Sequence, residues 1–249
     1  MQQSKKILEV KDVVTKFGKN LVHDGVNLHV NAGEIYGFLG PSGCGKSTLM
    51  REIIMLEQFH SGSIELLGQK IEKVRRRAAQ NLRMQWGVLF QSNALYTSLT
   101  VAENIALSLQ EYTKLSPSMI KDIVAFKIDI VGLKQFDGTL YPSEISGGMK
   151  KKAALARALV MDPKILFLDE PTSGLDPISA REFDALIVKL RDLLGISVVM
   201  VTHDLTSIHN TLDRMAVIDN KKIVAEGTLS EVTKIKSPFI ERFFDEGLR

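Results

Sequence analysis

A glycine-rich loop between a strand and a helix constrains this chain more than any other feature. Residues 40–48, with the sequence GPSGCGKST, fit the pattern G-x-x-x-x-G-K-[ST] of a phosphate-binding loop. The apolar run 35–39 before the loop predicts a buried strand, and residues 49–54 after it are typical of a helix. Strand, glycine loop and helix in this order predict an α/β fold that binds a phosphorylated ligand.

Each residue type in the loop has a reason to be there. Glycines let backbone N–H groups approach phosphate oxygens, and a helix N-terminus adds unpaired N–H groups and a positive dipole end. Lys46 supplies charge for the outer phosphates, and the Ser47 hydroxyl is a ligand for Mg²⁺. The phosphate-binding residues are therefore expected to be Gly40, Pro41, Ser42, Gly43, Cys44, Gly45, Lys46, Ser47 and Thr48.

Composition narrows the class of protein. The 249 residues carry a formal net charge of +3, too weak to indicate a nucleic-acid partner. Cys44 is the only cysteine, so an intramolecular disulfide is excluded and a reducing compartment is favoured. A small tolerated residue is the favoured interpretation of Cys44, although a helix N-terminus would favour its thiolate.

The same composition bears on membranes. No apolar run approaches the roughly 20 residues of a membrane span, and the polar residues 1–6 predict no signal peptide. We therefore expect a soluble, cytoplasmic chain that reaches a membrane only through a partner.

Two acids follow a buried strand further along the chain. Residues 165–168 form an apolar run that ends in Asp169 and Glu170. Buried carboxylates cost free energy unless they have a role. Beside a phosphate loop, Asp169 is placed to hold Mg²⁺ and Glu170 to orient and deprotonate water. Capping of the strand end is the lesser interpretation.

Three further side chains are candidates at the same end of the sheet. Gln91 follows the strand 87–90 and is a candidate ligand of Mg²⁺ or of the attacking water, although a lone glutamine is weak evidence. His203 follows the strand 197–201 and is placed to reach a γ-phosphate, whereas His29 is interpreted as a surface residue. Phe17 is either core or a ring that stacks on a purine.

Helical patterns replace strands between residues 92 and 152, which predicts a helical lobe inserted into the core. The lobe ends at Ser146, Gly147 and Gly148, where a helix start is either an anion site or a simple cap. Residues 150–152 are all lysines in the first turns of that helix. They indicate either a solvated face or an added positive field for an anion.

Three further segments predict local structure. Residues 62–68 predict an edge strand with a turn, and residues 215–226 predict a hairpin that turns at Asn220 and Lys221. In the tail, Phe239, Ile240, Phe243 and Phe244 share one helical face. This face is expected to pack on its own domain or on a neighbouring subunit.

Taken together, these motifs resemble the ATP-binding subunit of an ABC transporter over nearly the whole chain. Phe17 matches the A-loop of this family, residues 40–48 match its Walker A motif, and Gln91 matches its Q-loop. Residues 146–148 match the signature motif, and Asp169 and Glu170 match the Walker B motif. Residues 173–176 match the D-loop, and His203 matches the switch histidine. The resemblance implies ATP and Mg²⁺ as cofactors. It implies the P-loop NTPase fold of ABC ATPases, with an antiparallel β subdomain and an inserted α-helical lobe. One nucleotide-binding domain would span 1–249, with its core and β subdomain at about 1–91 and 153–249 and its helical subdomain at about 92–152.

The family mechanism follows from the same resemblance. Two copies would pair head to tail, so that Ser146, Gly147 and Gly148 of one chain cap the γ-phosphate held by Lys46 of the other. The implied catalytic residues are Glu170, His203 and Gln91, and the implied metal ligands are Ser47, Gln91 and Asp169. Hydrolysis would release the dimer and drive a membrane permease.

One departure from the family pattern narrows the resemblance. Met149 stands where the usual glutamine follows the signature glycines. Residues 146–158, residues 89–101 and the short tail 239–248 look most like ATPases of the Mla/Mce lipid-transport systems. This implies a phospholipid or related lipid cargo, an MlaE-like permease, an Mce-type lipid-binding protein, a small regulatory subunit and no nucleic acid. The location implied is the cytoplasmic face of the inner membrane. The alternatives are an importer of peptides or polar solutes and a soluble ABC protein without a permease.

Overall fold

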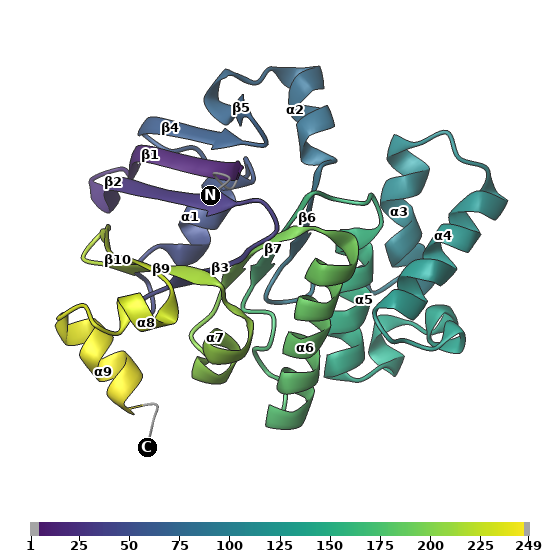
Figure 1. Cartoon of the computed structure of the whole chain (residues 1–249). Coiled ribbons are helices and arrows are strands. Elements are labelled where there is room, and N and C mark those ends of the chain that lie inside the picture. The colour runs from purple at the N-terminus through teal and green to yellow at the C-terminus, as the bar shows by residue number, and fades with distance from the viewer. Residues whose placement is uncertain (1–4, 247–249) are drawn as a thin grey trace.

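The computed structural model describes residues 5–246 and contains two β-sheets, a helical lobe and a C-terminal helix (Figure 1). Its strands are β1 (Lys6–Phe17), β2 (Asn20–Asn31), β3 (Ile35–Leu39), β4 (Ser61–Leu66), β5 (Gln69–Lys70), β6 (Trp86–Leu89), β7 (Ile165–Asp169), β8 (Ser197–Val201), β9 (Arg214–Asp219) and β10 (Lys222–Gly227). Its α-helices are α1 (Lys46–Ile53), α2 (Arg76–Arg83), α3 (Val101–Tyr112), α4 (Pro117–Ile130), α5 (Gly147–Leu159), α6 (Pro177–Leu194), α7 (Leu205–Thr211), α8 (Leu229–Val232) and α9 (Pro238–Glu246). Three short 3₁₀ helices are η1 (Ile71–Lys73), η2 (Gln135–Thr139) and η3 (Pro142–Glu144).

The six-stranded sheet has the order β10-β9-β3-β8-β7-β6, and only β10 runs antiparallel to its neighbour. The strands β3, β7 and β8 are buried on both faces, as expected for parallel strands covered on both sides. All the parallel strands end at one edge of the sheet. The phosphate loop, Gln91, Glu170 and His203 follow the strands β3, β6, β7 and β8, so this edge carries the candidate site.

Alternate residues of the central strands supply two separate cores. Leu166, Leu168 and Val198 pack with α5, α6 and the lobe helices, whereas Phe167 and Val199 pack with α1 and the antiparallel sheet. The period of two in a strand produces this division, because successive side chains point to opposite faces. The helix α1 thus lies beneath the antiparallel sheet, and the lobe lies on the other side of the central sheet.

The antiparallel sheet has the order β2-β1-β4-β5. One expectation changes here. The strand β4 lies between β1 and β5, so residues 62–68 do not form the edge. The strand β1 continues to Phe17, which pairs with Asn20 of β2.

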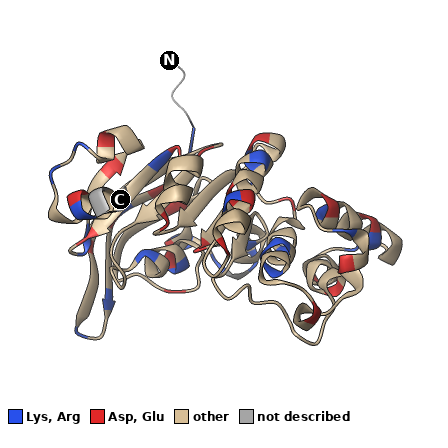
Figure 2. Cartoon of the chain, turned by 90° about the horizontal axis from the view of Figure 1, so that it is seen from below, with Lys and Arg blue, Asp and Glu red and all other residues tan. Residues whose placement is uncertain are grey.

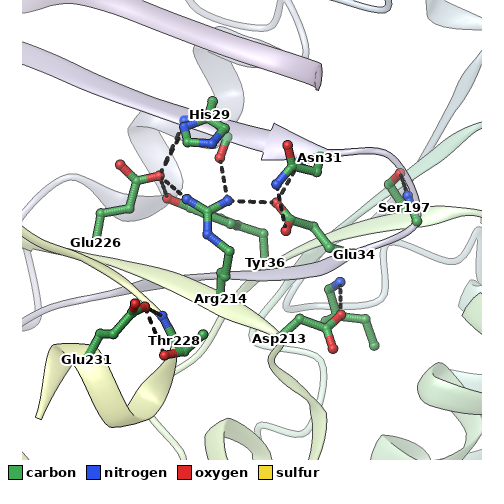
Figure 3. Close-up of polar contacts among 12 residues, drawn as sticks. His29, Asn31, Glu34, Tyr36, Ser197, Asp213, Arg214, Glu226, Thr228 and Glu231 are labelled. Atoms are coloured by element: carbon green, nitrogen blue, oxygen red, sulfur yellow. Dashed lines mark hydrogen bonds and ion pairs between the residues drawn. The ribbon is translucent and has the colours of Figure 1, made fainter. Parts of the chain in front are cut away.

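A polar network joins the two sheets where β2 passes β9 and β10 (Figure 3). Arg214 donates hydrogen bonds to Glu34 Oε1 at 3.1 Å, to Glu226 Oε1 at 2.8 Å and to the backbone oxygen of His29 at 3.3 Å. Tyr36 donates to Glu226 at 2.8 Å, and the ring of His29 lies 3.5 Å from the same carboxylate. The interpretation of His29 as a plain surface residue is therefore wrong, since its ring contacts this network.

The tail packs on its own chain. Ile240 and Phe244 are buried against Val217, Ala225 and Val232, which belong to β9, β10 and α8. Of the two expectations for the apolar face of α9, packing on its own domain is the one that the structure shows (Figure 1). The hairpin β9–β10 turns at Asn220 and Lys221, both with positive φ, as predicted.

The lobe is helical from Val101 to Glu144, with α3 and α4 side by side at one end of the molecule (Figure 1). The helix α5 then runs through residue 152 without a break and returns the chain to the central sheet. Seen from below, Lys and Arg are interspersed with Asp and Glu along most elements (Figure 2). Across residues 5–246 the helices are too short or too polar to span a bilayer.

Candidate nucleotide site

The phosphate loop bends between β3 and α1 through glycines that no other residue could replace. Gly45 has φ 103° and directly precedes α1, and a Cβ added there would lie 2.4 Å from the Nε2 of His23. A Cβ on Gly40 would lie 2.2 Å from the backbone oxygen of Ile218. The loop therefore packs so tightly on its support that only glycine fits at both positions.

Lys46 folds back over the loop. Its Nζ donates hydrogen bonds to the backbone oxygens of Gly40 at 2.8 Å and Pro41 at 2.9 Å. The side chain is 8% exposed, so the ammonium depends on these carbonyls for its hydrogen bonds. A phosphate oxygen is the stronger acceptor for such a group because it carries negative charge.

Cys44 does not have the environment of a reactive thiol. Burial raises the pKa of its thiol, and the nearby charge of Lys46 only partly opposes this effect. The sulfur packs against the core beneath the antiparallel sheet. The expectation that the thiolate is favoured here is therefore wrong, because desolvation of the thiol outweighs the charge and hydrogen bonds of Lys46.

A cleft of about 390 Å³ lies over the loop. It is lined by Phe17, Val22, Ser42, Gly43, Gly45, Lys46, Ser47, Thr48, Glu170 and His203. Phe17 is 50% exposed at the end of β1, so its ring is not part of the core and is free to meet a flat ligand. The cleft thus has an aromatic ring at one side and carboxylate, imidazole and ammonium groups at the other.

Asp169 and Ser47 meet beside the cleft. Ser47 Oγ donates a hydrogen bond to Asp169 Oδ1 at 2.9 Å. Burial raises the pKa of Asp169, and the hydrogen bond from Ser47 acts in the opposite direction. A hydroxyl and a carboxylate in contact are oxygen donors of the kind that Mg²⁺ prefers.

Glu170 is contacted by two of the other candidates. Gln91 Nε2 donates to Glu170 Oε2 at 2.8 Å, and His203 Nδ1 lies 3.2 Å from Glu170 Oε1. These three side chains come from the ends of β6, β7 and β8, which are adjacent in the sheet. The order of the strands therefore brings together residues that are separated by up to 112 positions in the sequence. No local sequence pattern predicts this contact.

The residues Ser146, Gly147 and Gly148 do not line the cleft. They begin α5, where Ser146 caps the helix by accepting a hydrogen bond from the backbone N–H of Met149. Ser146 and Gly147 are exposed. The side chain of Ser146 satisfies only one of the unpaired N–H groups at this helix start, so the cap leaves the others without a side-chain partner from Ser146.

Two basic residues of α5 have partners that the sequence did not indicate. Lys151 is 3% exposed and donates to the backbone oxygens of Gln91 and Glu170, so the interpretation of residues 150–152 as a solvated face is wrong for this residue. Arg157, in the last turn, donates to the backbone oxygens of Asn93 at 2.9 Å and Ala94 at 2.6 Å. For Lys151 one signal was available, since a cation in the first turns of a helix opposes its dipole.

The fold and this cleft define a P-loop nucleotide-binding protein with an acid pair beside the phosphate loop. Residues 23–173 match the family model of the ABC transporter. The chain belongs to the ABC transporter family, and it is an ATPase that uses ATP and Mg²⁺.

The sequence similarity to known ATP-binding proteins extends over nearly the full length of this chain. The "Intermembrane phospholipid transport system ATP-binding protein MlaF" of Haemophilus influenzae is 37% identical over 95% of this chain and 89% of its own length. The "Probable ribonucleotide transport ATP-binding protein mkl" of Mycobacterium leprae is 37% identical over 96% of this chain and 68% of its own. A solved ATP-binding cassette, MJ0796, in a dimeric post-hydrolysis state with ADP and Pi, has a TM-score of 0.81 and 28% identity over 89% of this chain and 98% of that one.

Proposed function

We propose that this chain hydrolyses ATP to power phospholipid transport at the cell envelope, as one subunit of a complex with a membrane permease. The observation that carries the proposal is the contact of Glu170 with both Gln91 and His203 beside the phosphate loop. A carboxylate with two polar neighbours at the end of a cleft is placed to accept a proton from water. The phospholipid cargo is supported by the likeness to MlaF.

Ser47, Asp169 and Gln91 would hold Mg²⁺. The contact between Ser47 and Asp169 leaves two oxygen donors at one point. This fits Mg²⁺, which binds few protein ligands and completes its shell with water and phosphate oxygens. When bound, it would neutralise charge on the outer phosphates.

The remaining side chains of the site each contact a different part of ATP. Phe17 stacks on the base, the amides of residues 42–48 and Lys46 hold the phosphates, and His203 contacts the γ-phosphate. Gln91 orients the water that Glu170 deprotonates. In the described arrangement, Gln91 and His203 each contact one carboxylate oxygen of Glu170, and each oxygen can still accept a hydrogen bond from water.

A second copy of the chain would complete the site. Ser146, Gly147 and Gly148 begin a helix but lie outside their own cleft, which is the arrangement expected if they cap the γ-phosphate of a partner. The similar cassette with ADP and Pi is dimeric. ATP would then hold the dimer together, and hydrolysis would release it.

The permease would bind a groove between the lobe and the central sheet. This groove, of about 870 Å³, is bordered by α2, β6, α3 and α5, and its lining includes Trp86, Phe90, Tyr96, Tyr112 and Met161. Aromatic and methionine side chains favour contact with a partner helix. Residues 92–152 would act as the lobe that transmits motion to the permease, and the rest of the single domain would hold ATP. We further propose that the complex contains an Mce-type lipid-binding protein and a small regulatory subunit. Its proposed location is the cytoplasmic face of the inner membrane.

Co-purification tests the cargo and the partners. The tagged chain is extracted from native membranes in mild detergent, and bound proteins and lipids are identified by mass spectrometry. A polytopic permease with an Mce-type protein and enriched phospholipid is the expected result. A permease with a solute-binding protein, or with bound nucleotides as the name of the mycobacterial relative suggests, would remove the lipid cargo. Soluble partners alone would contradict the transporter.

A further inference from the structure

Lys151 occupies an unusual place for a lysine. Its ammonium lies beneath the ends of β6 and β7, where it donates to the backbone oxygens of Gln91 at 3.0 Å and Glu170 at 3.3 Å. The residue is 3% exposed. Burial lowers the pKa of this ammonium, and the carboxylates of Glu170 and Asp169 oppose that effect only in part, so the hydrogen bonds to the two carbonyls are needed to hold the charged group there.

The backbone of Glu170 needs this support. Its φ is 46°, in the left-handed region that side chains other than glycine rarely adopt. Such a conformation persists only when the surrounding structure holds it. The N–H of Glu170 donates to the backbone oxygen of Val201 at 2.9 Å, and its C=O accepts from the backbone N–H of Ser173 at 3.1 Å and from Lys151 at 3.3 Å. Lys151 is thus the side chain that shares in holding this carbonyl.

Lys151 also controls the neighbour of Glu170. The side chains of Gln91 and Glu170 are joined at 2.8 Å, and their backbone oxygens are joined through one ammonium. Gln91 and Glu170 follow the adjacent parallel strands β6 and β7, so they lie side by side. One link joins their side chains directly, and the other joins their backbone oxygens through Lys151. A change in the position of Lys151 would therefore alter the distance between the carboxylate and the amide.

The helix α5, which carries Lys151, begins at Ser146, the residue proposed to contact the ATP of the partner. Lys151 is five positions after Ser146, which caps α5. The same helix holds the backbone oxygens of residues 93 and 94 through Arg157. An α-helix moves as a unit over this length, so a ligand bound at Ser146 would move Lys151 with it.

We propose that Lys151 is a positioning residue that holds Gln91 and Glu170 in register for hydrolysis and couples them to the helix start at Ser146. The inference rests on the proposed roles of Glu170 and Ser146. In the head-to-tail dimer, Ser146 contacts the ATP of the partner, whereas Glu170 serves the ATP of its own chain. Lys151 thus connects the two ATP sites through one helix.

The test uses the complex purified from native membranes through a tag on this chain. Lys151→Met keeps the length of the side chain and removes the ammonium. We expect kcat for ATP to fall about 10–100-fold, with KM changed less than about threefold, because the lost contact serves the transition state. Lys151→Arg keeps donors for both carbonyls, so it should recover most of the activity.

Lys152→Met is the matched control. Lys152 is the next residue of α5, but its Nζ lies 3.9 Å from where a Cβ on Gly132 would be, in the lobe. This variant should keep kcat within about twofold of the unchanged chain. Equal losses in Lys151→Met and Lys152→Met would overturn the inference, as would unfolding of Lys151→Met without rescue by Lys151→Arg.

A double variant separates this inference from the proposed function. If Lys151 acts through Glu170, then Lys151→Met adds no further loss of kcat to Glu170→Gln. Losses that multiply would overturn the inference while the role of Glu170 stands. Full turnover in Glu170→Gln alone would instead contradict the proposed function. Equal cooperativity between ATP sites in Lys151→Met and in the unchanged complex would contradict the coupling.

Discussion

At the scale of single residues, the site depends on side chains whose environments differ sharply. The ammonium groups of Lys46 and Lys151 are both buried and both donate to backbone carbonyls, yet one lies over the phosphate loop and the other beneath the acid pair. Glu170 remains partly exposed, at 22% of its side chain. A carboxylate that reaches solvent can receive a water molecule, which is the requirement for a general base.

Replacing Glu170 by Gln tests this role. The amide keeps the size of the side chain but cannot accept the proton of water, so turnover should fall about 10²–10⁴-fold. Binding of ATP should be unchanged, since the phosphate loop is untouched. Steady-state hydrolysis and titration calorimetry of the same preparation measure the two quantities. A loss of affinity equal to the loss of rate would contradict a role confined to chemistry.

At the scale of elements, the packing of α6 against α7 contains a buried acid. Asp184 of α6 is 2% exposed, and it accepts a hydrogen bond from Ser207 Oγ of α7 at 2.7 Å. Its other oxygen, Oδ1, has no hydrogen-bond partner among the described residues. Burial raises the pKa of Asp184 to about 6, from an ordinary value of 3.8. The charged form is thus disfavoured where these two helices meet.

This acid makes stability depend on pH in a defined direction. Between pH 3.8 and about 6 the folded chain holds a proton on Asp184 that the unfolded chain has lost, so stability decreases as the pH rises through this window. Above it, the cost of the buried charge is fully present. Asp184→Asn should therefore stabilise the protein by about 1–3 kcal/mol at pH 8, with a smaller gain at pH 5.

Thermal unfolding at several pH values measures this effect. Asp122→Asn, at an exposed position of α4, is the matched control and should change the free energy of unfolding by less than about 0.5 kcal/mol. A gain in Asp184→Asn that is equal at pH 5 and pH 8 would contradict the assignment.

The sequence predicts elements better than it predicts the surroundings of single groups. The phosphate loop, the strand before Asp169 and the cap at Ser146 have local patterns, and the structure forms each of them where expected. The burial of Lys151 has no local pattern, because its partners are carbonyls that β6 and β7 supply from elsewhere in the chain. The same holds for the thiol of Cys44 and the ring of His29, whose environments depend on tertiary packing.

At the scale of the whole molecule, the cleft and the start of α5 are separate surfaces of one chain. The cleft lies at the sheet edge, and the exposed start of α5 lies at the return from the lobe (Figure 1). Under the proposed function these surfaces are two parts of one site, which a second copy with the parts exchanged would complete. Assembly would then depend on the bound nucleotide.

The dependence can be measured with the slow variant. Glu170→Gln with ATP and Mg²⁺ should double in mass in light scattering, and ADP should leave it as a monomer. Adding Gly147→Asp should abolish the doubling, because a carboxylate at that helix start repels the γ-phosphate of the partner. A Cβ at Gly147 meets nothing within 4 Å, so the fold should tolerate the change. Persistence of the dimer in the double variant would contradict the role of the helix start.

The network around Arg214 has a consequence for which ligands fit. Phe17 belongs to the antiparallel sheet and Lys46 follows a strand of the central sheet, so a nucleotide bound between them spans both sheets. Arg214 and Glu226, which both belong to the central sheet, contact His29 of β2 in the antiparallel sheet (Figure 3). These contacts help to fix the distance between the ring of Phe17 and the ammonium of Lys46, and a bound nucleotide would have to match that distance.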